Sequence, residues 1–216
     1  MTTTVLPVTA DTDIFQEAPT TNRSTLTSSG MGEYNGQVWL FRGLWQFAGL
    51  NDGTIPSSDI VSSAILTLTT ATDASANARN HRIFRLVRSD AVIAQATWNI
   101  YKTGSNWSTA GAFHADDCEQ TDIGLVNMAN NVAANTAVNF TLGIAAIQAI
   151  VSGEWASNIL FGKVDTESND CYLYHSKEAA TEAYRPYLTI THTMPKPYRT
   201  RRGINLLGRQ GRRLVF

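Results

Sequence analysis

Charged side chains are scarce in this sequence. Lys, Arg, Asp and Glu make up 16% of its 216 residues, whereas about a quarter is usual for soluble proteins. Thr, Ser, Asn and Ala fill the difference, and such a polar, uncharged composition favours β structure over helix. Hydrophobic residues make up 43% of the chain, so the sequence can still form a real core.

Long hydrophobic runs are missing as well. No window approaches the roughly 18 apolar residues that a membrane span needs. The first 15 residues, MTTTVLPVTADTDIF, have neither the positively charged nor the apolar region of a signal peptide. We therefore expect a soluble product that is made inside a cell, is not exported by the usual route and does not bind membranes.

The sequence also lacks the motifs of catalytic and cofactor sites. It contains no G-x-S-x-G nucleophile elbow and no glycine loop that would hold a phosphate. Nothing in the order of its Ser, His and Asp residues suggests a triad. The four histidines have no metal-site spacing: His81, His114, His175 and His192. We expect no enzymatic activity, no catalytic residue and no cofactor.

There are only two cysteines, Cys118 and Cys171. They could form one bridge, but a pair with this spacing has no specific signature. Nothing else in the sequence points to an oxidising compartment, so we expect two free thiols.

The densest acidic stretch is HADDCEQTD, residues 114–122. Hard oxygen ligands close together are what Ca²⁺ prefers, but the ordered spacing and the glycine of a calcium loop are missing. A solvated loop is the favoured interpretation, and a calcium site is the alternative. Its ligands would be Asp116, Asp117, Glu119 and Asp122.

Short segments with alternating hydrophobic residues recur along the chain, separated by clusters of Gly, Asn, Asp, Ser and Pro. This pattern predicts an antiparallel sandwich or barrel rather than alternating strands and helices. One segment, GIAAIQAIVSGEW (143–155), has helical spacing and a possible C-cap at Gly153, so we expect one short helix across one end of the sandwich. The predicted strands are 37–47, 62–72, 81–89, 137–143, 158–164, 171–177 and 187–193.

The charge is distributed unevenly. Of the 17 cations seven lie between Pro195 and Phe216, where there is no acid, which leaves ten cations against all 18 acids in residues 1–194. The near-neutral average therefore hides an acidic body with a net charge of −8 and a tail with +7. Two prolines after the last predicted strand end the domain. We expect one domain, residues 1–193, followed by an extended basic C-terminal arm, residues 194–216.

Such an arm is typical of an interaction segment. Its apolar residues would be exposed to water if it were free, which favours a protein partner over the two alternatives, packing on its own domain and contact with nucleic acid. The residues expected to bind the partner are Arg199, Arg201, Arg202, Leu206, Leu207, Arg209, Arg212, Arg213, Leu214 and Phe216.

Several segments together resemble the DNRLRE-type β-sandwich domain, a jelly-roll-like module that is also classed among carbohydrate-binding modules. The similarity covers about residues 10–192, although Gln46 departs from the usual pattern and the basic tail is no part of that domain. The resemblance implies a jelly-roll-like antiparallel β-sandwich with a binding or structural role and no catalysis. It is carried by DTDIFQ (11–16), RGLWQFAGLNDGTIPSSDIVSSAILTL (42–68), ATWNIYKTGSNWSTAGA (96–112), SGEW (152–155) and RPYLTI (185–190).

Three aromatic residues of one loop-rich segment, Trp98, Tyr101 and Trp107, admit two interpretations. Exposed aromatic rings stack on sugars and anchor interfaces, so these residues are candidates for glycan stacking. The favoured alternative is that Trp98 and Trp107 are core residues of the sandwich.

Related sandwich domains occur as accessory proteins on bacteriophage particles, which need no signal peptide because cell lysis releases them. The leading hypothesis is therefore a non-enzymatic, multicopy structural protein of a bacteriophage virion. It would be a capsid decoration or cement protein, or a neck or tail accessory protein, bound through its arm to capsid or neighbouring subunits. The alternative is a carbohydrate-binding module that recognises a surface polysaccharide.

Overall fold

The computed structural model describes residues 1–34, 39–73, 77–167 and 170–195. These residues form an all-β fold with one short α-helix, α1 (Ile144–Val151), and two 3-10 turns, η1 (Ala48–Leu50) and η2 (Glu182–Tyr184). The strands are β1 (Thr2–Pro7), β2 (Ala10–Phe15), β3 (Ser28–Glu33), β4 (Leu40–Gln46), β5 (Ile60–Asp73), β6 (Arg79–Arg85), β7 (Ile100–Lys102), β8 (Ser105–Asn106), β9 (Gly124–Met128), β10 (Ala137–Thr141), β11 (Ile159–Val164), β12 (Cys171–His175) and β13 (Tyr187–Thr193).

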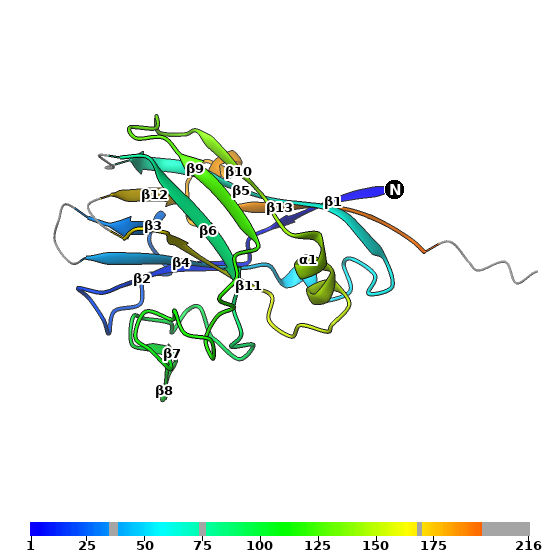
Figure 1. Cartoon of the computed structure of the whole chain (residues 1–216), viewed down its shortest axis with the longest axis horizontal. Helices are drawn as coiled ribbons and strands as arrows, with labels where there is room; N and C mark the ends of the chain where they lie inside the picture. Colours follow the sequence, from blue (N-terminus) through cyan, green and yellow to red (C-terminus); the bar gives the residue numbers. More distant parts are fainter. Residues whose placement is uncertain (35–38, 74–76, 168–169, 196–216) are drawn as a thin grey trace, which may run out of the picture.

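Two antiparallel sheets curl around a shared core (Figure 1). The first contains β1, β13, β5 and β10 in this order, and the second contains β2, β4, β11, β6 and β9. The long strand β5 joins them, because its last residues pair with β12, which pairs with β3, and β3 pairs with the start of β4. On the other side β9 contacts β10.

The main core lies between the two sheets. Strand β13 shows how the sequence builds it, because buried and partly exposed residues alternate along its whole length, as a strand with one buried face requires. Leu188 and Ile190 of β13 face inward and pack in a cluster that also contains Trp45, Phe140 and Tyr172, which are completely buried.

A second hydrophobic cluster covers the opposite face of the second sheet. Leu44, Phe84 and Phe161 pack there against Trp98 and Trp107, which belong to the long excursion 86–118 that carries the small hairpin β7–β8. Strand β11 is therefore buried at all six positions. Because this sheet is covered on both faces, it buries more apolar area than a sheet of a two-layer sandwich, which is covered on one face only.

The predicted helix is confirmed. Ile147, Ile150 and Val151 are buried and α1 packs against β5. Gly153 follows with φ = 82°, a left-handed conformation that glycine adopts without steric cost. The helix lies at one end of the sheets (Figure 1).

Every strand predicted from alternation is present, with ends that differ by a few residues. Five further strands, β1, β3, β7, β8 and β9, were not predicted. The sequences of β1, β3 and β9 are TTTVLP, SSGMGE and GLVNM, which are short and contain proline or glycine, and β7 and β8 have only three and two residues. Their pairing depends on neighbouring strands more than on intrinsic preference. Strand β13 ends at Thr193, the position at which the sequence places the end of the domain.

Candidate functional site

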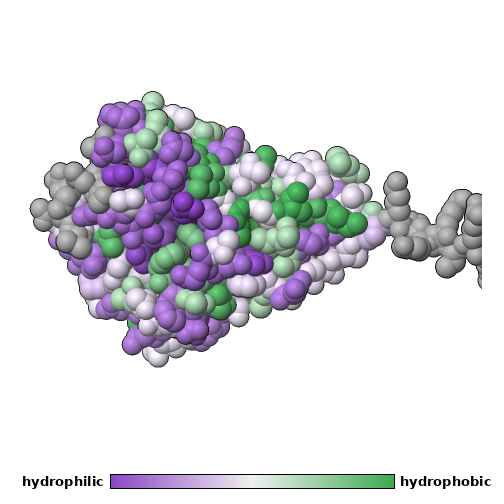
Figure 2. All heavy atoms as spheres, viewed as in Figure 1, coloured by the Kyte–Doolittle hydropathy of each residue, from purple (hydrophilic) through white to green (hydrophobic). Residues whose placement is uncertain are grey.

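The sheet formed by β1, β13, β5 and β10 is nearly free of charge, and we call it the uncharged sheet. Its strands contain no Lys, Arg, Asp or Glu except Asp73, the last residue of β5. Helix α1 contains none either. In Figure 2 the wide end of the molecule is mainly hydrophilic, whereas the narrow end, where β1, α1 and the start of β5 lie (Figure 1), is mainly neutral or hydrophobic.

The outer face of the uncharged sheet carries mainly Thr, Ser, Asn and aliphatic side chains in register, together with Pro7 and Tyr187. Val5, Thr189 and Ile65 form one row across β1, β13 and β5. Val5 is 58% exposed and Ile60, at the start of β5, is 53% exposed. A surface without charges and with exposed aliphatic groups is typical of the central part of a protein–protein interface.

Strand β1 forms an edge of this sheet, since among the described residues it pairs only with β13. The N–H of Val8 donates to the carbonyl of Pro186. In an antiparallel ladder hydrogen-bonded positions alternate, so the N–H groups of Thr3 and Val5 point away from β13. Natural edge strands are usually protected by lysine, proline or a bulge, but β1 has only Pro7 at its end.

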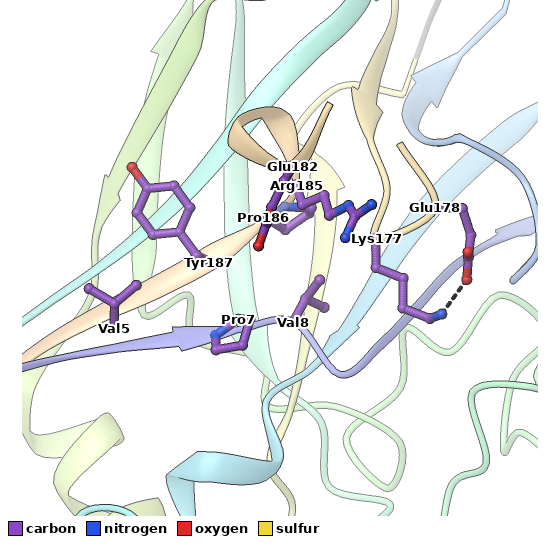
Figure 3. Close-up of a pocket in the computed structure, with 9 residues that line it drawn as sticks. All are labelled: Val5, Pro7, Val8, Lys177, Glu178, Glu182, Arg185, Pro186 and Tyr187. Carbon is purple, nitrogen blue, oxygen red and sulfur yellow. Dashed lines mark hydrogen bonds and ion pairs between the residues drawn. The ribbon is translucent and has the colours of Figure 1, made fainter. Parts of the chain in front are cut away.

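A hollow of about 480 Å³ lies beside the end of β1. Figure 3 shows that its residues come from three places: β1 and Val8, the segment after β12, and the turn η2 with the start of β13. Apolar and charged groups are mixed in its lining. It is lined by Val5, Pro7, Val8, Lys177, Glu178, Glu182, Arg185, Pro186 and Tyr187.

We call the end of the molecule that holds β1, α1 and the start of β5 the uncharged end, because these strands and this helix contain no Lys, Arg, Asp or Glu there. Three residues at this end form a hydrogen-bonded chain. Nδ1 of His192 lies 2.7 Å from Oδ2 of Asp59, and Nε2 lies 2.9 Å from Oγ1 of Thr4. The order of groups, a hydroxyl, a base and an acid, is that of a catalytic triad. The sequence did not predict this arrangement, because the three residues are far apart in the chain and only the pairing of the strands brings them together.

This chain of groups lacks the surroundings of a nucleophile. Thr4 is on the inward side of β1, whereas the hollow opens beside Val5 and Pro7. Acyl transfer also needs N–H donors aimed at the developing oxyanion. Val61 lies opposite His192 across the sheet, but its backbone N–H donates to Oε1 of Gln148 and is not free for this role. We therefore interpret the three residues as a structural link between β1, β13 and the loop before β5.

The cations of the described residues are used within the domain. Nine of the ten form ion pairs with acids, and the tenth, Arg185, donates to the carbonyl of Ala179. A phosphate backbone is bound through accessible cations, and each of these ten described cations already has a partner within the domain. The paired cations are Arg23, Arg42, Arg79, Arg82, Arg85, Arg88, Lys102, Lys163 and Lys177.

The four acids considered for calcium do not converge. Asp117 is buried and accepts from Arg88 and from the N–H groups of Ser108 and Thr109. Glu119 pairs with Arg85 and Asp122 pairs with Arg82, while the side chain of Asp116 is largely exposed. Over the described ranges no group of His, Cys, Asp and Glu could hold a metal ion.

Two of the three aromatic residues considered for glycan stacking are core residues. Trp98 is 7% and Trp107 4% exposed. The guanidinium of Arg42 lies over the Trp98 ring at 5.0 Å, and Nε1 of Trp107 donates to the carbonyl of Thr97. Their ring faces are therefore covered by protein, and only Tyr101, which is partly buried against Trp107, remains near the surface.

Neither cysteine forms a disulfide, as expected. Cys118 is buried in the cluster under the excursion 86–118, and Cys171 is buried beside Phe15 and Phe41. Burial, with a smaller effect of the nearby Asp117 carboxylate, raises the pKa of the Cys118 thiol to about 12. A thiol with such a pKa is a poor nucleophile.

The residues of the predicted partner-binding arm lie outside the described residues. They are Arg199, Arg201, Arg202, Leu206, Leu207, Arg209, Arg212, Arg213, Leu214 and Phe216. The last described residue is Pro195, two positions after the end of β13, so the arm follows directly from a strand of the uncharged sheet.

No protein-family model matches the chain, and no curated protein matches it either. A search of the described helices for one long and apolar enough to cross a membrane finds none. Its function is therefore inferred from the surface chemistry of the domain and the sequence of the arm.

Proposed function

We propose that this protein is a non-enzymatic structural protein of a bacteriophage virion, a capsid decoration or cement protein that is anchored by its C-terminal arm. The observation that carries the proposal is the separation of charge. An acidic, internally ion-paired domain has one uncharged end, and a segment with seven cations and no acid begins at that end.

This separation suits a protein that binds by one end. Charged groups are costly to bury in the centre of an interface unless they are paired, and the uncharged sheet has almost none to bury. The wide, hydrophilic end (Figure 2) suits exposure to solvent. The arm adds electrostatic and apolar contacts, and many copies on a particle add avidity.

The phage assignment itself rests on the resemblance of residues 10–192 to the DNRLRE-type sandwich domain, because related sandwich domains occur on bacteriophage particles. A position in the neck or tail is a variant of the same proposal. The alternative of a carbohydrate-binding module through Trp98, Tyr101 and Trp107 is less well supported, because two of the three rings are buried.

The test is to supply the full chain or residues 1–195 during growth of the phage that encodes it, and to assay purified particles by mass spectrometry. We expect the full chain in many copies per particle, and the truncated chain to be folded but absent. A full-length variant with Arg209, Arg212 and Arg213 all replaced by lysine keeps the charge of the arm and is the matched control. Absence of the full chain from particles would overturn the proposal, and incorporation of the truncated chain would show that the arm is not the anchor.

A further inference from the structure

We propose that the free edge of β1 and the hollow at its end receive residues 203–216 of a neighbouring copy of this chain. The inference rests on the proposed function, because it names the site to which the arm binds. It concerns contact between copies of this protein, whereas the proposed function also allows the arm to bind another virion protein.

The first argument is the state of the edge. The N–H groups of Thr3 and Val5 point away from β13, and β1 carries no charged side chain that would keep another strand away. An added strand would satisfy these groups and extend the uncharged sheet from four strands to five. Such strand addition is a common mode of peptide recognition.

The second argument is the pattern of the arm. Residues 203–208, GINLLG, form an uncharged stretch of six residues, and β1 is an uncharged strand of six residues. Cations follow at once: Arg209, Arg212 and Arg213. A strand laid along β1 in the same direction therefore brings its arginines to the end of β1, where the hollow is.

The third argument is the chemistry of the hollow. It contains the carboxylates of Glu178 and Glu182 beside the apolar groups of Pro7, Pro186 and Tyr187. Among the described residues Glu182 forms no ion pair, and Glu178 pairs only with the partly exposed Lys177. Arginine binds carboxylates in a two-point geometry, and the apolar groups can pack against the stems of arginines and the hydrophobic end of the arm.

A neighbouring copy is favoured over the same copy by the connection. Pro195 and Pro197 favour extended conformations at the residues before them, which does not suit an immediate reversal back across β1. The segment 196–202 also carries four of the seven cations, and a tight crossing would crowd them together. Exchange of arms between copies avoids both costs and links the copies in series.

The experiment combines two single-cysteine variants of the full chain, Val5→Cys and Leu206→Cys. The native cysteines are buried, so the new thiols are the accessible ones. We expect a disulfide between the two proteins when they are mixed under mild oxidation. In separate variants of the full chain that keep the native Val5 or replace it by proline only, Thr3→Pro or Val5→Pro tests the edge, because each removes an N–H that β13 does not use.

For the edge variants we would measure self-association of the full chain by sedimentation. Val5→Pro should weaken it by about tenfold or more, since strand addition depends on these hydrogen bonds, and the matched control Val5→Thr should not. Glu182→Gln should weaken it as well. Melting temperatures of all variants show whether each is folded, and Thr3→Pro repeats the test if Val5→Pro is not.

Three results would overturn the inference. A disulfide that forms only within one chain carrying both cysteines would place the arm on its own domain. Self-association of residues 1–195 that Val5→Pro abolishes would show that the edge receives β1 of a second copy. A monomeric full chain that still enters particles by its arm would leave the proposed function intact and assign the arm to another virion protein.

Discussion

Asp59 and His192 are joined by a contact of 2.7 Å between Oδ2 and Nδ1, at the uncharged end of the molecule. Asp59 is buried, and its other oxygen, Oδ1, has no hydrogen-bond partner among the described residues. His192 is thus the side chain that compensates for burial of this carboxylate, and its second nitrogen extends the link to Thr4 on β1.

Removing either partner should destabilise the domain. We expect His192→Gln and Asp59→Asn each to lower the free energy of unfolding by about 1–3 kcal/mol, because a buried polar group loses its partner. Thr4→Val removes only the outer contact and should cost about 1 kcal/mol. Urea unfolding of the three variants is the measurement. Equal, negligible effects of all three would contradict the structural role of this link.

The fold could largely be predicted from the sequence because most strands have one buried face. Alternation in residues 62–72 and 187–193 marks β5 and β13, and the spacing of isoleucines marks α1. Among the strands that escaped prediction, β1 and β3 carry little periodicity and depend on their partners. The central feature of the candidate site, the edge of β1, was missed for the same reason.

Contacts between distant parts of the chain could not be predicted. Thr4, Asp59 and His192 meet only through the pairing of β1 with β13 and of β13 with β5. Trp98 and Trp107 are buried, as the favoured interpretation of the sequence predicted, but nothing local in the sequence showed that the excursion 86–118 folds back over the second sheet. The separation of charge, by contrast, can be counted along the sequence, although only the strand order shows that the uncharged segments form one sheet.

Asp11 should make stability depend on pH. Burial raises its pKa to about 7 although the N–H of Lys177 donates to it. Between about pH 4 and 7 the folded protein therefore binds a proton that the unfolded chain has lost, so this contribution to stability decreases as the pH rises through that range. Asp11→Asn should stabilise the protein near pH 8, by on the order of 2 kcal/mol.

The measurement is urea unfolding of both proteins near pH 8 and near pH 5. The gain from Asp11→Asn should be larger at the higher pH. Asp116→Asn, at an exposed acid, should change stability little at either pH. A gain that is independent of pH would argue that Asp11 is ionised throughout.

His81 should change the stability with pH in the opposite direction from Asp11. Burial lowers its pKa to about 3, and it stays neutral with Nδ1 2.7 Å from the hydroxyl of Tyr174. The unfolded chain binds a proton below about pH 6.5 that the folded protein does not bind. The contribution of His81 to stability is thus complete above pH 6.5 and decreases as the pH falls toward 3, by up to about 1.4 kcal/mol per pH unit.

His81→Asn keeps an acceptor for Tyr174 and cannot titrate. We expect this variant to be less stable than the native protein near pH 7, and the difference to shrink toward pH 4. His114→Asn, at an exposed histidine, is the control. A constant difference across this range would show that His81 is not held neutral in the folded protein.

The two thiols should be unreactive in the folded protein. Cys118 is completely buried and its pKa is raised to about 12, and Cys171 is buried as well, whereas nucleophilic reactivity requires an accessible thiolate. We expect an aromatic disulfide reagent to label neither cysteine at neutral pH and to label both after unfolding in guanidinium. Fast labelling of Cys118 in the native state would mean that the excursion 86–118 opens readily.

Substitutions at Trp98 and Trp107 test whether these side chains belong to the core or to a sugar-binding surface. Because both indoles are buried, Trp98→Ala and Trp107→Ala should each lower the free energy of unfolding by about 3–5 kcal/mol. Tyr101→Ala, at a partly buried ring, should cost about 1 kcal/mol. Trp98→Phe keeps most of the apolar volume under Arg42 and is the matched control, with a loss between these two.

A stacking platform would behave differently: its truncation would abolish binding to a glycan array while the unfolding midpoint stayed the same. If Trp107→Ala gave that result, the indole would have to be accessible in solution, and the carbohydrate-binding alternative would replace the structural assignment of this segment.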